Sequence, residues 1–313
     1  MSAEPTTHAR KPILIAGPTA SGKSALALSL ARQLDGCIIN ADSMQVYREL
    51  SILTARPGAE EEAQVPHRLY GHVPAHEAYS VGRYAEDAAR AIAQAQAQGL
   101  RPIITGGTGL YFKALLEGLS PIPPIAASVR AHWRREGEVR GSGALHAVLQ
   151  ERDPVMAGRL DAADTQRVVR ALEVLEETGR SLASWQEQPG TPVIAGDAIR
   201  LLVTRPRSEL HARADARFDA MMARGALDEA ARLAALHLSS ELPAMRVLGA
   251  GPLIAAVRGE LELADAVTRA KAETRQYIKR QETWARRYMI SWKSIDAQLM
   301  ERIAANGLPF IDL

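Results

Sequence analysis

The stretch LIAGPTASGKSALA, residues 14–27, constrains this chain more than any other part of it. Residues 17–24 fit the phosphate-loop pattern of a glycine, four residues and Gly-Lys-Ser/Thr. An apolar run precedes this loop and good helix formers follow it, so we expect a strand, a loop and a helix in succession. Such a loop binds phosphate oxygens through backbone N–H groups and the helix N-terminus. The pattern predicts polyphosphate binding but leaves the reaction open.

The roles of the loop residues follow from the same pattern. Lys23 would supply a positive charge and Ser24 a hydroxyl for Mg²⁺. We expect the backbone N–H groups of residues 19–22 to converge on the phosphates. The alternative, a glycine-rich turn without a ligand, is disfavoured by the flanking strand and helix. The residues expected to bind the polyphosphate are Gly17, Pro18, Thr19, Ala20, Ser21, Gly22, Lys23 and Ser24.

Strands and helices alternate around the loop, which indicates the fold class. Apolar runs predict strands at 11–16, 37–40, 101–105 and 199–203, with helices at 24–34, 81–98 and 110–116 between them. This alternation predicts an α/β fold: a P-loop NTPase-like core with a parallel sheet flanked by helices. The ligand should lie beyond the carboxyl ends of the strands.

The pattern changes at residues 118–128, GLSPIPPIAAS, where three prolines mark a crossing between domains. From 129 to about 185 the pattern is helical, and the strand at 199–203 returns to the sheet. We therefore expect a mobile N-terminal tail at 1–11, a catalytic core formed by 12–118 and 198–313, and an all-helical insertion domain at 119–197. From residue 208 to the end, only helices are expected.

Charge and composition narrow the class of protein. The net charge of +2 is too small to indicate a nucleic-acid partner, but residues 265–293 carry eight Lys/Arg against three acids. A solvated helix face is the simpler interpretation of that segment. The single cysteine, Cys37, excludes an intrachain disulfide and fits a core residue. A single cysteine suits a reducing cytoplasm, and without an apolar run long enough for a membrane span we expect no membrane partner.

One acidic residue has a suggestive position. A P-loop ATPase usually has an apolar strand that ends in an acid near the metal. The predicted strand at 101–105 ends in Gly-Gly-Thr instead, and the acid is Asp42, after the strand at 37–40. A carboxylate there could take a proton from a nucleophile or bind Mg²⁺. A turn former or helix cap is an equally open interpretation of Asp42.

Seven stretches together resemble one family in order and spacing, the tRNA dimethylallyltransferases (tRNA isopentenyltransferases, or IPP transferases). The resemblance extends from about residue 12 to residue 292. The stretches are GPTASGKS, ADSMQVYREL…TARP, VPHRLYGHV, YSVGRYAEDA, PIITGGTGLYFKALLEGL, DTQRVVRALEVLEETGRSL and TRQYIKRQETWAR.

The resemblance implies an enzyme that transfers a dimethylallyl group from dimethylallyl diphosphate to a tRNA. The acceptor would be the N(6) amine of the adenosine 3′-adjacent to the anticodon in tRNAs reading UNN codons, giving N(6)-dimethylallyladenosine and diphosphate. By position, Asp42 would accept the proton of the amine, Thr108 would lie beside the reaction centre and Lys23 would stabilise the departing diphosphate. Ser24 would hold the Mg²⁺ cofactor, with Asp42 as a second candidate ligand. Arg213 and Arg217 are candidates for the diphosphate, and a surface-helix role is equally open for both.

The partner implied is the anticodon stem-loop of tRNA, bound by a monomer. The resemblance assigns to it Asp42, Ser43, Met44, Gln45, Thr108, Arg130, Gln166, Arg167, Val168, Val169 and Arg170, and the basic segment adds Arg275, Lys279 and Arg280. For Arg167 and Arg170 the alternative is surface pairing with Asp164 or Glu173. Where many relatives read Gly-Tyr-Arg, this chain has residues 249–252 as GAGP, so we expect no aromatic or cationic contact there.

Three other functions are compatible with the loop alone. The first is a small-molecule or nucleoside kinase that uses ATP. The second is a prenyltransferase that acts on free adenine nucleotides, and the third is a P-loop RNA-binding module without catalysis. The helical insertion and the basic C-terminal segment favour a macromolecular acceptor over a free nucleotide, and Asp42 with Thr108 favours an enzyme over a binding module.

Overall fold

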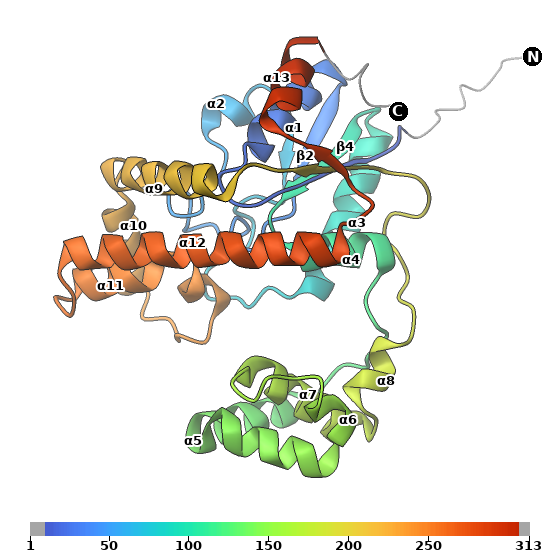
Figure 1. Ribbon diagram of the computed structural model, residues 1–313, viewed down its shortest axis with the longest axis vertical. Coiled ribbons are helices and arrows are strands. Elements are labelled where there is room, and N and C mark those ends of the chain that lie inside the picture. Colours follow the sequence, from blue (N-terminus) through green and yellow to red (C-terminus); the bar gives the residue numbers. More distant parts are fainter. Residues whose placement is uncertain (1–9, 307–313) are drawn as a thin grey trace, which may run out of the picture. The chain divides into compact units, whose positions relative to one another are not determined.

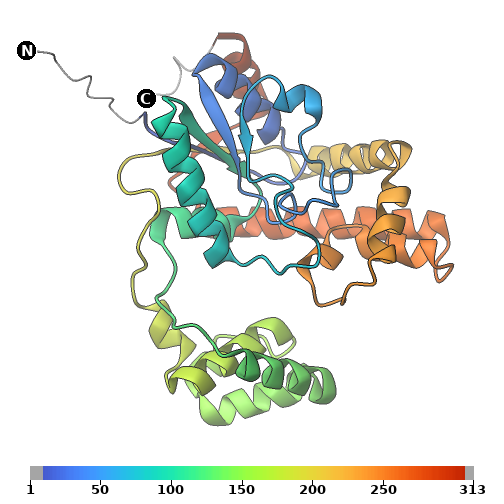
Figure 2. The ribbon, with the colours of Figure 1, turned by 180° about the vertical axis from the view of Figure 1, so that it is seen from behind.

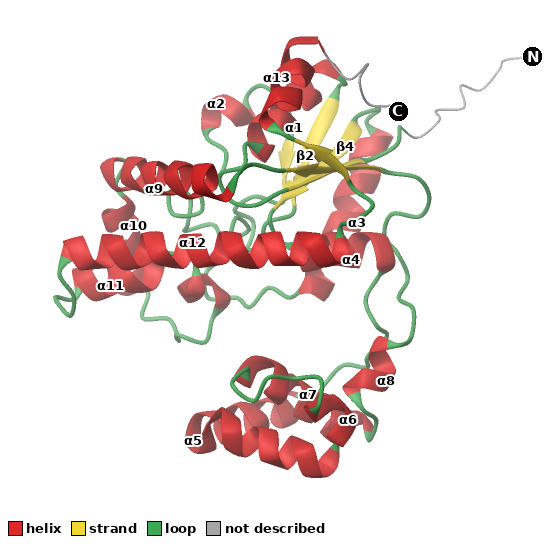
Figure 3. Cartoon of the chain, viewed as in Figure 1, coloured by secondary structure: helices red, strands yellow, loops and turns green. Residues whose placement is uncertain are grey.

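The computed structural model describes residues 10–306, and most of the predicted mobile tail, residues 1–9, lies outside that range. It contains a six-stranded sheet, parallel throughout, in the order β3-β2-β4-β1-β5-β6. Figure 3 shows strands of this sheet in yellow, and Figure 1 labels β2 and β4. The strands are β1 Ile13–Ala16, β2 Gly36–Asn40, β3 His67–Arg68, β4 Arg101–Gly106, β5 Ile199–Val203 and β6 Lys293–Ile295. The predicted α/β fold with a parallel sheet is confirmed.

Two strands were not predicted, for a physical reason. β3 has two residues and β6 has three, which is too short for an alternating pattern to emerge. The expectation of helices alone after residue 208 is therefore wrong at Lys293–Ile295, where the chain pairs in parallel with β5. In this pairing Val203 lies opposite Ile295, and both side chains are fully buried.

Helices cover both faces of the sheet. The long ones in the sheet-containing part are α1 Lys23–Gln33, α3 Val81–Ala97, α4 Gly109–Glu117, α9 Arg207–Ala223, α10 Ala226–Ala235, α11 Ala250–Val257, α12 Leu263–Tyr288 and α13 Ala297–Asn306. Shorter turns of helix are α2 Ala59–Glu62 and η1 Pro243–Arg246. Alternate strand residues point to opposite faces, so Ile13 and Ile15 pack with α1 while Leu14 and Ala16 pack with α3 and α4. Figure 2 shows α3 from the side opposite to that of Figure 1.

The chain divides into two compact units, Met1–Leu116 with Val193–Leu313, and Glu117–Pro192. The second is helical and consists of α5 Ala127–Arg152, α6 Pro154–Ala157, α7 Thr165–Thr178 and α8 Leu182–Gln186. Its core has Leu145, Leu149 and Leu172 fully buried. No helix in residues 10–306 is both long enough and apolar enough to cross a membrane.

Helix α12 runs across the carboxyl ends of the central strands (Figure 1), as its contacts show. Gln281 and Trp284 of α12 lie beside Gly106 and Gly107 at the end of β4. Ion pairs fasten α12 to the neighbouring α9: Arg275 Nη1 lies 2.8 Å from Asp215 Oδ2, and Arg207 Nε lies 2.7 Å from Glu282 Oε2. The helix is thereby held over the edge where ligands bind in such sheets.

Gly106 provides a test of how closely these segments pack. A Cβ at this position would lie 2.1 Å from the backbone carbon and oxygen of Ala41, which cannot retreat like a side chain. We expect Gly106→Ala to lower the free energy of unfolding by about 1–3 kcal/mol. Gly82→Ala is the control, because a Cβ there meets only Ser80 Oγ at 3.8 Å. Equal melting temperatures for the two variants would contradict this packing.

Candidate active site

Three turns with predicted site residues follow three adjacent strands. In the order β2-β4-β1, the phosphate loop follows β1, the Asp42 segment follows β2 and the Gly-Gly-Thr turn follows β4. Register aligns their ends, because Thr105 of β4 lies opposite Ile15 on one side and Asn40 on the other. Parallel strands end at the same edge of a sheet, so residues far apart in sequence meet there.

The phosphate loop has free donors, but fewer than the sequence predicted. Gly22 is the N-cap of α1 with φ of 100°, and among the described residues no side chain caps it. The first amides of α1 are therefore left for an external anion. Two amides of the predicted set are already used, since Thr19 N–H donates to Gln281 Oε1 at 2.8 Å and Ser21 N–H to the Pro18 carbonyl at 3.2 Å.

Arginines of the second half of the core hold the loop from outside. Arg205 Nε donates to the Ser21 carbonyl at 2.8 Å, and Arg213 Nε donates to the Ala20 carbonyl at 3.0 Å. These bonds satisfy carbonyl oxygens of the loop that would otherwise repel an anion. Arg213 is thus a support of the loop.

Lys23, Arg217 and Asp42 influence one another electrostatically, which places them in one site. The pKa of Lys23 is lowered from 10.5 to about 8, mainly by burial, with the charge of Asp42 raising this pKa and that of Arg217 lowering it. Burial also lowers the pKa of Arg217, and Asp42 opposes that shift. Lys23 Nζ donates to the Pro18 carbonyl at 3.3 Å. Two cations and one carboxylate therefore lie at the phosphate loop.

Hydrogen bonds join the Asp42 segment to the Gly-Gly-Thr turn. The Thr108 hydroxyl accepts Ser43 N–H at 2.9 Å and donates to Ser43 Oγ at 3.2 Å. Thr108 N–H donates to the Ala41 carbonyl at 3.2 Å. Asp42 Oδ1 accepts Met44 N–H at 3.0 Å, so the carboxylate shapes its own turn with one oxygen. Both interpretations of Asp42, turn former and reactive group, are compatible with this geometry.

Sequence reasoning missed two residues of α12 beside this centre. Gln281 donates from Nε2 to the Gly107 carbonyl at 3.0 Å and accepts Thr19 N–H with Oε1. Burial raises the pKa of Tyr277, Asp42 raises it further, and hydrogen bonds with Thr108 and Gln281 act in the opposite direction. The helical spacing of the sequence could have indicated Gln281. It lies on the buried stripe of α12 formed by Ala266, Ala270, Thr274, Ile278 and Gln281.

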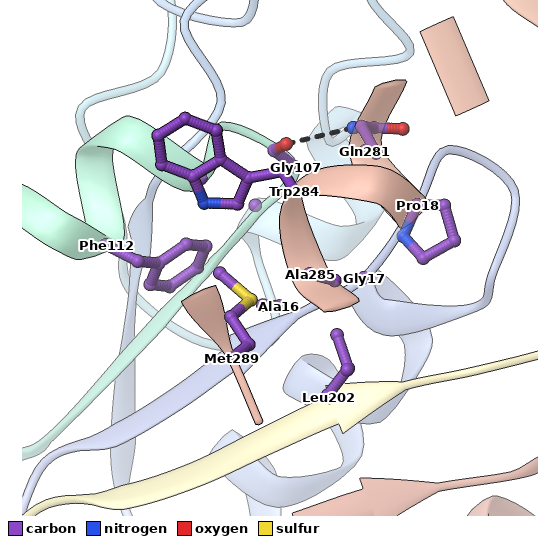
Figure 4. Close-up of a pocket in the computed structure, with 12 residues that line it drawn as sticks. Ala16, Gly17, Pro18, Gly107, Phe112, Leu202, Gln281, Trp284, Ala285 and Met289 are labelled. Carbon is purple, nitrogen blue, oxygen red and sulfur yellow. Dashed lines mark hydrogen bonds between the residues drawn. The ribbon is translucent and has the colours of Figure 1, made fainter. Parts of the chain in front are cut away.

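A small cavity of about 20 Å³ lies between the strand ends and α12 (Figure 4). Apolar side chains form much of its wall: Phe112, Leu202, Trp284 and Met289. The indole Nε1 of Trp284 is buried and has no partner within the described residues. The polar phosphate loop thus borders apolar surface at Gly17 and Pro18.

Comparisons with known proteins identify the family of this chain. A family profile described as IPP transferase matches residues 45–288, and one described as isopentenyl transferase matches residues 11–75. The chain belongs to the IPP transferase family. A curated relative from Parvibaculum lavamentivorans, a tRNA dimethylallyltransferase, is 50% identical over 96% of this chain and 95% of its own length. Another with that name, from Nitrobacter hamburgensis, is 54% identical over 88% and 87%.

Solved structures of IPP transferases agree with the fold. The tRNA isopentenylpyrophosphate transferase of Bacillus halodurans is 30% identical, covers 94% of both chains and has a TM-score of 0.68. A eukaryotic dimethylallyltransferase, solved acting on tRNA, is 27% identical with a TM-score of 0.80 over 95% of this chain and 76% of its own. The P-loop NTPase-like fold predicted from the sequence is that of this family.

Some of the residues predicted to bind tRNA are exposed in this IPP transferase, and others are buried or already hydrogen-bonded within the protein. In the sheet-containing unit, Lys279 and Arg280 are exposed, whereas the Arg275 guanidinium is taken up by Asp215. Gln45 Nε2 donates hydrogen bonds to the carbonyls of Thr54 and Ala55, at 2.8 and 3.1 Å. Ser43 and Met44 are half-buried.

In the helical unit, Arg130, Gln166 and Arg167 are exposed. The predicted alternative of surface pairing is present for Arg167, which pairs with Asp164 at 3.3 Å. Arg170 pairs at 3.4 Å with Glu173, which is buried. Val168 and Val169 are 0% and 8% exposed in the core of this unit. A contact with tRNA at those two positions would therefore have to come from their neighbours.

The lowered pKa of Lys23 predicts a pH dependence of anion binding. Below about pH 8 the ammonium is charged in the free protein, and as the pH rises through 8 that charge is lost. Relative to Lys23→Arg, which stays charged, we expect the wild-type affinity for inorganic diphosphate to fall roughly tenfold from about pH 7 to about pH 9. Calorimetry on both proteins in matched buffers cancels the titration of diphosphate itself. A ratio independent of pH would contradict the assignment of Lys23.

Proposed function

We propose that the chain transfers a dimethylallyl group from dimethylallyl diphosphate to the N(6) amine of the adenosine 3′-adjacent to the anticodon, in tRNAs reading UNN codons. The observation that carries the proposal is the meeting of the phosphate loop, Asp42 and Thr108 at three adjacent strand ends in a member of the IPP transferase family. The names of the relatives, tRNA dimethylallyltransferases, support the same reaction. They do not favour the kinase alternative.

In this reaction the allylic C–O bond to the diphosphate breaks and a C–N bond to the adenine amine forms. The electron pair of the broken bond leaves on the diphosphate, where negative charge develops. Lys23, Arg217 and the first amides of α1 supply positive charge at that position. The phosphate loop then holds a leaving group, and no phosphoryl group is transferred.

Asp42 accepts the proton that the amine loses. One carboxylate oxygen is occupied by Met44 N–H, so the other is available to the incoming amine. The lone pair of an exocyclic amine is delocalised into the base, and hydrogen bonding to a carboxylate increases its nucleophilicity. Thr108, which is bonded to Ser43, holds the Asp42 segment at the end of β4. The target base has to leave its stack to reach this site.

The oxygen atoms at the loop fit Mg²⁺ in character. Ser24 is exposed at the first turn of α1, and Asp42 has a carboxylate oxygen outside its own turn. Ser24 would hold the ion together with oxygens of the diphosphate and water, as Mg²⁺ prefers, and the Asp42 oxygen would be a ligand only in place of its bond to the amine. When bound, Mg²⁺ neutralises charge on the departing diphosphate. The described residues contain no cluster of three or more His, Cys, Asp or Glu side chains suited to a metal.

The acceptor is the part of the proposal that one experiment tests directly. The purified protein is incubated with Mg²⁺ and labelled dimethylallyl diphosphate, and either an unmodified tRNA reading a UNN codon or free AMP is added. We expect label in N(6)-dimethylallyladenosine after digestion of the tRNA, and at most trace label in AMP. The same tRNA with guanosine in place of the target adenosine is the control. Efficient labelling of AMP would favour the nucleotide-prenylating alternative.

Asp42→Asn separates the proton-accepting role from the structural one. Asparagine keeps an oxygen for Met44 N–H but cannot take the proton, so the turn should persist while the chemistry slows. We expect single-turnover transfer to fall on the order of 10²–10⁴-fold. The affinity for tRNA, measured by filter binding, should change by less than about threefold. Unchanged single-turnover chemistry with weaker tRNA binding would instead make Asp42 a recognition residue.

A further inference from the structure

Gln281 is the one side chain on the described part of α12 that bonds to both the phosphate loop and the Gly-Gly-Thr turn. Its Oε1 accepts Thr19 N–H at 2.8 Å, and its Nε2 donates to the Gly107 carbonyl at 3.0 Å. The side chain is 8% exposed, so water competes little for these bonds. Figure 4 shows the bond to Gly107.

The two partners belong to opposite sides of the reaction. Thr19 lies in the loop that would bind the diphosphate of the donor. Gly107 precedes Thr108, whose hydroxyl is bonded to Ser43 beside Asp42, on the side of the acceptor. A Cβ added to Gly107 would lie 2.2 Å from Gln281 Nε2 and 3.5 Å from Asp42 Oδ2, so the amide and the carboxylate flank the same residue. A displacement of either bond would therefore change the spacing between donor and acceptor.

The orientation of the amide leaves no choice of partner. Thr19 presents an N–H and Gly107 presents a carbonyl, so only oxygen toward Thr19 and nitrogen toward Gly107 satisfies both. α12 itself is anchored to α9 on both sides of this position, through Arg275–Asp215 and Glu282–Arg207. Gln281 is thus a short link on a rigid element, which is how a fixed spacing is maintained.

We propose that Gln281 is a positioning residue that sets the spacing between the diphosphate held by the phosphate loop and the amine held at Asp42 and Thr108. The role rests on the proposed function for its kinetic part. Its structural part, coupling of the loop to the turn, holds for any polyphosphate in the loop. A misplacement of about 1 Å at a reacting centre can lower a rate on the order of 10²-fold.

The kinetic test compares Gln281→Leu, which loses both bonds, with Gln281→Glu. We expect Gln281→Leu to lower kcat about tenfold to a hundredfold, with the KM for the donor and the Kd for tRNA changed by less than about threefold. The control is Gln33→Leu, the same change at an exposed position of α1, which should leave kcat unaltered. An unchanged kcat in Gln281→Leu, or a loss due only to weaker tRNA binding, would overturn the proposal.

The glutamate variant adds a readout that a loss of folding would not produce. Ionised, it sets a carboxylate against the Gly107 carbonyl; protonated, it offers an O–H to that carbonyl and an oxygen to Thr19 N–H, as glutamine does. Burial and the carbonyl raise the pKa of such a carboxyl. Activity relative to wild type should therefore rise as the pH is lowered from about 8 to about 6. A ratio that stays flat or falls, in a folded variant, would contradict the role.

Hydrogen exchange separates this proposal from the proposed function. In the wild type, inorganic diphosphate should slow amide exchange in residues 105–109, because a loop fixed by diphosphate also restricts the Gly-Gly-Thr turn through the bonds of Gln281. In Gln281→Leu that protection should be lost while diphosphate still binds. Protection without prenyl transfer would refute the proposed reaction and leave the link intact. Equal protection in both proteins would refute the link.

Discussion

The parallel pairing of β2, β4 and β1 is the constraint on which the rest of the site depends. Each strand ends at the same edge, and each is followed by a turn with residues that we propose take part in the reaction. The Asn40 side chain, at the end of β2, accepts Asp42 N–H at 2.8 Å and donates to the Asp42 carbonyl at 2.9 Å. These two bonds hold the backbone of Asp42 in place. Helix α12 then closes this edge through Gln281.

The charges at this edge explain why a phosphate loop can serve a reaction that transfers no phosphate. Lys23, Arg217 and Asp42 influence one another electrostatically at the loop; in the proposed reaction the two cations would face the departing diphosphate and Asp42 would take the proton. Asp42 also favours the charged form of both cations, which burial disfavours. Leaving-group stabilisation and proton acceptance are thus mutually supportive in one electrostatic site.

Local patterns predicted much of this arrangement. The loop, four of the six strands and the parallel sheet follow from apolar runs and glycines. Asp42 follows from its position after a strand, and Thr108 from the family resemblance. Patterns of period 2 or 3.6 cannot show a bond between residues 262 apart, such as Thr19 to Gln281. They also could not show that the Thr19 amide is already used. Val168 and Val169 were drawn into the predicted tRNA surface by the motif around them, although both face the core of their unit.

The fate of the diphosphate tests the central claim most directly. The protein, in excess over unmodified tRNA, is given dimethylallyl diphosphate labelled on phosphorus and, in parallel, ATP labelled on its γ-phosphate. We expect intact diphosphate to be released in a one-to-one ratio with prenylated adenosine in a single turnover, and ATP to be left unhydrolysed. Transfer of the γ-phosphate to an acceptor, or release of diphosphate without formation of the prenylated nucleoside, would contradict the claim that the phosphate loop holds a prenyl donor.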